Sequence, residues 1–192
     1  MNRPKPTKHS HVVFNQLCKL IPVGMVRNLA SEYGVDKKCR TFSACSHVVS
    51  LLYAQLTHSI GLNDVCDALR HHCAKLFVIR GATPPSRNGL SHANKTRDAD
   101  MMEALFWKML EHLKNQSPGF GPAGRYKGLP RRFKKAVYSI DSSTIALVAS
   151  CMDWAKHRRR KAAAKLRLRL NLQTFLPNFA VIEEGYHHDS TE

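Results

Sequence analysis

Long apolar runs are missing from this sequence of 192 residues. No stretch approaches the roughly 20 consecutive apolar residues that a membrane-spanning helix needs. The N-terminus, Met1 to Pro6, is basic and has no apolar stretch behind it, which argues against a secretory signal. Hydrophobic residues still make up 43% of the chain, so a packed core is feasible. We therefore expect a folded protein that does not enter a membrane.

Acidic residues are scarce. The chain has 14 Asp and Glu against 30 Lys and Arg, which gives a net charge of +16. Between Arg125 and Leu170 stand fourteen Lys and Arg but only two acids, Asp141 and Asp153. A solvated surface normally mixes charges of both signs, and so large an excess of one sign usually serves an anionic partner. We interpret the basic segments as contacts to a phosphate backbone.

Cysteine pairs at metal-binding or redox spacing are also absent. The six cysteines stand at positions 18, 39, 45, 66, 73 and 151, and no two are separated by just two residues. This spacing argues against zinc-ribbon and thioredoxin-like sites. We expect reduced thiols in a cytosolic protein.

Apolar residues recur at helical spacing through the first part of the chain. The stretches 12–21, 23–33, 42–58 and 63–72 are predicted helices, and a further helix should begin near Asp100, with Glu103 as its capping-box partner. The apolar face of that last helix is expected to comprise Met102, Leu105, Phe106, Met109, Leu110 and Leu113. Segments 81–89 and 117–124 are rich in Gly and Pro and are expected to be loops.

After the second loop the pattern becomes extended, which favours an α+β fold. Residues 136–140 are predicted to form a short buried strand, with Asp141 at or just past its end. Residues 166–173 alternate strictly, which predicts a leucine face and an outer basic face carrying Arg167 and Arg169. Residues 179–183 are expected to pair back onto that strand.

Asp141 is the candidate with the most specific chemistry. It is a lone acid in a basic segment, on a strand of otherwise apolar residues. Phosphoryl transfer by two divalent cations needs several carboxylates, and one carboxylate cannot hold both ions. The residues alone leave an equal alternative, in which Asp141 caps the turn 142–144 through local hydrogen bonds.

Several motifs resemble bacterial insertion-sequence transposases of the DDE class. They are IDSSTI at 140–145, SCMDWAKHRRRKAAAK at 150–165, FLP at 175–177 and HHD at 187–189, with LSHAN at 90–94 and FW at 106–107 upstream. The resemblance covers essentially the whole chain and is specific over 131–192. It implies metal-dependent strand cleavage and strand transfer at the ends of an insertion sequence.

The resemblance implies three regions. Residues 1–75 would be a helical N-terminal domain that recognises DNA ends, 76–130 a helical linker region, and 131–192 the first three, antiparallel strands of a ribonuclease-H-like catalytic domain. Asp141 would be the first acid of the catalytic triad and would bind Mg²⁺ or Mn²⁺. The predicted DNA contacts are Arg131, Arg132, Lys134, Lys135, Arg158, Arg159, Arg160, Lys161 and Lys165. The expected partner is double-stranded DNA, with a possible homo-oligomer, at the bacterial nucleoid in the cytoplasm.

The sequence departs from the family after its third predicted strand. In the family the second Asp lies on a later strand and the Glu on a later helix, and Asp189 stands too early for the second position. The expectation is therefore an N-terminal portion of a transposase, truncated and inactive alone. Two alternatives stay open: a non-catalytic DNA-binding repressor of transposition, and a small basic RNA-binding protein.

Overall fold

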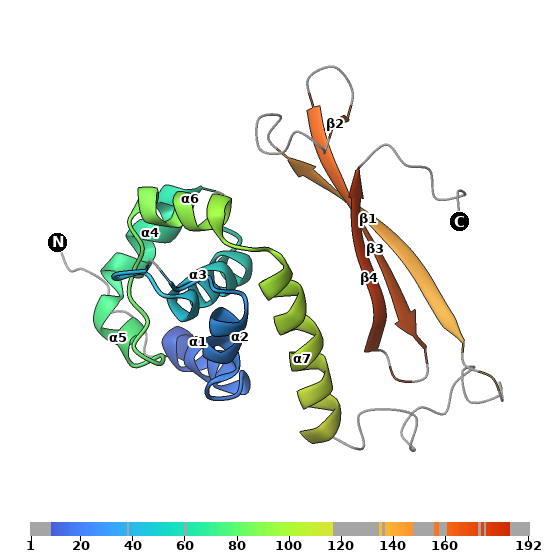
Figure 1. Cartoon of the computed structure of the whole chain (residues 1–192), viewed down its shortest axis with the longest axis horizontal. Helices are drawn as coiled ribbons and strands as arrows, with labels where there is room; N and C mark the ends of the chain where they lie inside the picture. Colours follow the sequence, from blue (N-terminus) through green and yellow to red (C-terminus); the bar gives the residue numbers. More distant parts are fainter. Residues whose placement is uncertain are drawn as a thin grey trace. The chain divides into compact units, whose positions relative to one another are not determined.

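The computed structural model describes residues 9–37, 39–59, 61–116, 135, 137–147, 156–157, 161–172, 174 and 176–184. The chain divides into two compact units, Met1–Leu113 and Lys114–Glu192. The described part of the first unit consists of helices, and the described part of the second unit is mostly an antiparallel sheet (Figure 1). The α+β class predicted from the sequence is confirmed. No helix among the described residues is long and apolar enough to cross a membrane.

The helices are α1 His9–Leu20, α2 Met25–Glu32, α3 Ala44–Thr57, α4 Leu62–His71, α5 Cys73–Phe77, α6 Arg87–Thr96 and α7 Asp100–Gln116. All five predicted helices are present, and Gly34 follows α2 with a positive φ of 65°, a backbone conformation that favours glycine at a helix end. The prediction of a loop over 81–89 is wrong for residues 87–89, which form the start of α6. Ser86 accepts a hydrogen bond from the Gly89 N–H at 3.0 Å and so caps α6.

The apolar face of α7 differs from the predicted one. Met101 is fully buried and Leu105 and Leu110 are buried, whereas Phe106 and Leu113 are exposed. The expected capping box does not form, because the Asp100 N–H donates to Oδ1 of Asp98 at 3.0 Å. Oε1 of Glu103 instead accepts the indole N–H of Trp107 at 3.2 Å. The helix is rotated so that Met101 meets the core, which helical periodicity alone does not determine.

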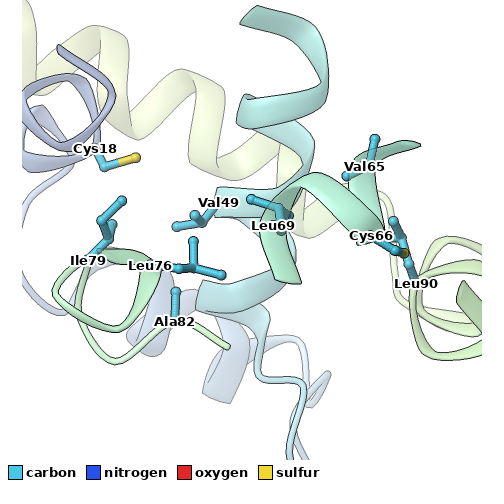
Figure 2. Packing of buried hydrophobic residues seen from close by; sticks show 9 residues of the cluster. All are labelled: Cys18, Val49, Val65, Cys66, Leu69, Leu76, Ile79, Ala82 and Leu90. Atoms are coloured by element: carbon cyan, nitrogen blue, oxygen red, sulfur yellow. The ribbon is translucent and has the colours of Figure 1, made fainter. Parts of the chain in front are cut away.

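Two hydrophobic clusters hold the helical unit together. The first joins residues of α1, α3, α4, α5, α6 and the turn after α5; its members are Cys18, Val49, Val65, Cys66, Leu69, Leu76, Ile79, Ala82 and Leu90 (Figure 2). The second comprises Ile21, Val26, Leu29, Ala30, Ala44, Val48, Met101 and Leu105. Because α7 supplies Met101 and Leu105, residues after 75 complete the core that the first three helices begin.

The five cysteines in the described part carry free thiols. Cys18 and Cys66 are buried in the first cluster, whereas Cys73 is exposed. Burial raises the pKa of the Cys18 thiol to about 11, although nearby Arg80 favours the thiolate. The buried thiols therefore act as small apolar groups.

His47 of α3 is a buried polar side chain, 3% exposed. Its Nε2 lies 2.7 Å from Oδ1 of Asn94 on α6. Its Nδ1 is buried and finds no hydrogen-bond partner among the residues that the structure describes. Burial lowers the pKa of His47 from its usual 6.5, and the charge of Arg97 lowers it further, against the hydrogen bond to Asn94.

The neutral form of His47 makes the helical unit sensitive to acid. A depressed pKa in the folded state means that the unfolded chain binds this proton first as the pH falls. The contribution to stability is complete above the unfolded pKa of about 6.5 and declines as the pH falls below it. We expect His47→Gln, which can still bond to Asn94 but does not titrate, to lose less stability than wild type between about pH 7.5 and about pH 5.5. Urea unfolding at both values measures this, and equal losses would contradict it.

The sheet contains β1 Tyr138–Leu147, β2 Lys156–His157, β3 Lys161–Asn171 and β4 Leu176–Glu184. β3 is central: β1 pairs with one edge, and β4 and the short β2 pair with the other, all antiparallel. β1 is neither short nor buried as predicted. It continues past Asp141 to Leu147, and Ile140 is 73% exposed.

Pairing register shows which residues share a face. Directly opposite residues of antiparallel strands lie on the same side of the sheet. Asp141 pairs with Leu168 and Leu168 with Ala180, which defines a leucine face. Arg169 pairs with Ile140 on one side and Phe179 on the other, which defines the opposite, arginine face. The predicted alternation of β3 is confirmed, but the expected outer position is wrong for Arg167, which is 6% exposed.

Candidate nucleic-acid interface

Asp141 lies in the interior of β1, on the leucine face. Its side chain is exposed, and its Oδ1 accepts the N–H of Ser142 at 2.9 Å. A local hydrogen bond was the alternative weighed from the sequence, but here it forms within a strand, since residues 142–144 are extended. The carboxylate is therefore presented from a sheet rather than from a turn.

The described residues do not fit a two-metal centre. Asp141 has Ser139 and Ser143 as its same-face neighbours on β1 and Leu168 across from it. No group of three or more His, Cys, Asp or Glu residues that could hold a metal ion occurs in the described part of the chain. Asp141 offers a single carboxylate, and holding two divalent ions side by side takes several.

The predicted DNA contacts fall into three sets. Arg131, Arg132, Lys134, Arg158, Arg159 and Arg160 lie outside the described residues. Lys135 is exposed just ahead of β1, and Lys161 opens β3. Lys165 is only 8% exposed, so little of its side chain is available to a ligand in this structure.

Arg169 is a functional candidate that sequence reasoning did not select. Its guanidinium lies 5.2 Å from the ring centroid of Tyr138 and 5.5 Å from that of Phe179. Its Nε donates to Oδ1 of Asn178 at 3.0 Å. Asn178 is the extra residue at a register shift, because Arg169 pairs with Phe179 and the next residue, Leu170, pairs with Pro177. The bulge thus places the Asn178 amide beside the guanidinium.

The two rings around Arg169 are accessible to a ligand. Tyr138 is 45% exposed and Phe179 is 39% exposed. Many single-strand binding surfaces combine exposed aromatic rings, on which bases stack, with cationic side chains that contact the backbone. The signal in the sequence was the alternation of β3, but the ring neighbours come from strands paired across the sheet, which alternation does not reveal.

Arg167 has a different role on the same face. Its Nε lies 3.3 Å from Oε2 of Glu183, and the two side chains are 8% and 24% exposed. A charge pair with little solvent access is costly to break, because removing one partner leaves the other buried and uncompensated. Arg167 therefore stabilises the sheet through this ion pair, whereas Arg169 lies near the surface.

Comparison with known proteins finds a family match for the first part of the chain. Residues 9–79 match the model of a family described as a domain of unknown function, DUF4372. No curated protein and no solved structure matches the chain. The match covers α1 to α5, and the compact helical unit continues beyond it to Leu113. Residues 9–79 are thus similar to the DUF4372 family, and α6 and α7 follow them in the chain before the segment that forms an antiparallel sheet.

Proposed function

We propose that this chain is a DNA-binding transposase of the DDE class that acts at insertion-sequence ends. The observation that carries the proposal is the position of Asp141: the acid stands in the first of three long, consecutive antiparallel strands, inside a segment with a large excess of Lys and Arg. The DUF4372 family is commonly found in transposase-like proteins, which supports the same proposal.

The finer fold assignment is a ribonuclease-H-like sheet. Its support is the order of the long strands, β1, β3 and β4, each paired antiparallel with the next along the chain. In that assignment Asp141 is the first of the acids that hold Mg²⁺ or Mn²⁺. When bound, such ions neutralise charge on the attacking and leaving oxygens of a phosphodiester.

Residues 1–192 are proposed to bind DNA without cutting it. A single carboxylate does not hold two cations, and the described residues place no second one beside Asp141. These residues supply binding: the cations between Arg125 and Lys161 for phosphates, and the Tyr138, Arg169 and Phe179 group for stacking or backbone contacts.

A cleavage assay on duplexes carrying insertion-sequence ends tests this proposal. With Mg²⁺ present, we expect wild-type residues 1–192 to shift the duplex on a gel and to leave both strands intact. Asp141→Asn removes a negative charge without changing side-chain size, so the variant should bind at least as tightly. Nicking by wild type that Asp141→Asn abolishes would overturn the proposal that these residues do not cut.

Repression of transposition is the second candidate, favoured by the excess of Lys and Arg around Asp141 together with the lack of a second carboxylate beside it among the described residues. A chain that occupies ends without cutting them competes with an intact enzyme. Adding residues 1–192 to an active transposase should then lower end cleavage in proportion to occupancy. Preference for RNA over duplex DNA in a competition assay would instead support an RNA-binding protein.

A further inference from the structure

The helix α6 presents an unusual surface for its size. Its exposed residues include Asn88, Ser91, His92 and Lys95, and it contains no acid among its ten residues. At 100° per residue these four positions fall on one side of the helix, opposite buried Leu90 and Ala93. All four side chains can donate a hydrogen bond, and three can also accept one.

This helix is held by contacts from several directions. Leu90 belongs to the first hydrophobic cluster, and α6 packs beside α4 (Figure 1). Asn94 bonds to buried His47 of α3. Just ahead of the helix, the Thr83 N–H donates to Oγ of Ser46 at 3.0 Å. A ten-residue helix is marginal by itself, so these contacts keep the polar side rigid.

A hollow of about 550 Å³ adjoins one flank of α6. His92 and Thr96 line it from the helix, and the segment after α2 contributes a wall with Lys37 and Arg40, both exposed. Arg97 at its edge is already engaged, since it bonds to the carbonyls of Phe42 and Ser43 and pairs with Asp36 at 3.6 Å. Asp98 is the acid in the lining, so Lys37 and Arg40 leave the wall positive.

We propose that α6 enters the major groove of duplex DNA, with Asn88, Ser91 and Lys95 facing base edges and Lys37 and Arg40 holding the adjacent phosphate backbone. The groove is wide enough for one α-helix, and asparagine, serine and lysine have donors and acceptors suited to base edges. A rigid helix beside a positive wall meets both needs of recognition, because phosphate contacts position a protein and base contacts specify the sequence. This inference rests on the proposed function and names the surface that reads the DNA end.

The experiment separates base reading from general DNA binding. Duplexes of about 20 base pairs, roughly two helical turns, are selected from a random pool with the full wild-type chain. Fluorescence anisotropy at one fixed salt concentration then gives affinities for the selected duplex and for the pool. The triple variant Asn88→Ala, Ser91→Ala, Lys95→Ala should lose about 10- to 100-fold of the preference for the selected duplex. Its affinity for the pool should change only a few-fold, since the variant removes a single cation.

A matched control comes from α2. Arg27→Ala, Asn28→Ala, Ser31→Ala also removes one cation, one asparagine and one serine from exposed helical positions. This control should keep the wild-type preference. Lys37→Ala, Arg40→Ala should weaken binding to both duplexes alike and reduce the slope of log affinity against log salt by about 1 for each phosphate that the variant no longer neutralises.

Asn88→Asp guards against a folding artefact. The position lies in the first turn of α6, where a negative charge favours the helix. Lost preference in this variant therefore reports the changed side chain at the base edges and not unfolding of the helix. Unchanged preference in the α6 variants, an equal loss in the α2 control, or no sequence selected by wild type would overturn the inference while general DNA binding stands. Failure of wild type to bind duplex DNA, or selective binding of RNA, would overturn the proposed function as well.

Discussion

Raising the monovalent salt concentration from about 50 mM to about 200 mM is expected to weaken binding of duplex DNA by about 1,000-fold or more. The reason is release of counterions, because each phosphate neutralised by Lys or Arg frees ions from the DNA. The stretch from Arg125 to Leu170 alone carries fourteen Lys and Arg against two acids. Engagement of about six of them suffices for this effect. Anisotropy titrations across a salt series measure it as the slope of log affinity against log salt.

The control for the salt effect removes charge without shortening side chains to alanine. Changing Arg131, Arg132, Lys134 and Lys135 together to glutamine should make the slope shallower by about 0.9 for each phosphate that these side chains neutralise in wild type. A wild-type slope near zero would contradict a binding mode dominated by phosphates. An unchanged slope in the glutamine variant would show that other cations bind those phosphates.

Met101→Ala is expected to lower the free energy of unfolding of the helical unit by about 2–5 kcal/mol. Met101 has no solvent exposure, and it packs in a cluster with Leu29, Ala30 and Val48 from α2 and α3. Truncation removes buried apolar surface and leaves a cavity that a packed core closes only in part. Urea unfolding followed by helical circular dichroism measures the loss.

Leu113→Ala on the same helix is the matched control. That side chain is 38% exposed, so its truncation should cost about 1 kcal/mol or less. Similar losses in the two variants would mean that α7 contributes helicity and not core packing. A small loss for Met101→Ala would show that residues matching DUF4372 are stable without α7.

The sequence predicted where helices and strands lie better than it predicted which of their faces are buried. Helical spacing predicted where α3 and α7 lie, but it placed Phe106 and Leu113 in the core and left out Met101. Helical periodicity locates the buried apolar stripe of a helix only to within one residue position. Which flank is buried depends on the partners, here Leu29 and Val48, which stand more than 50 residues earlier in the chain.

The helix α6 was missed for a related reason. Its residues, from Arg87 to Thr96, are mostly polar and follow two prolines, which is typical of a loop. Only Leu90 and Ala93 are buried, too few for a periodic signal. The helix forms because Ser86 caps it and because α3 and α4 supply contacts that local sequence does not encode.

Some properties follow from composition and periodicity alone. The α+β class, the switch from helices to strands after residue 117, the alternation of β3 and the strong positive charge are local or additive quantities, so the order of residues suffices to predict them. The burial of Arg167, the aromatic rings around Arg169 and the positive wall beside α6 depend on how the chain folds in three dimensions. Each of these brings together side chains from segments far apart in the chain, and no local pattern determines which distant segments will pair.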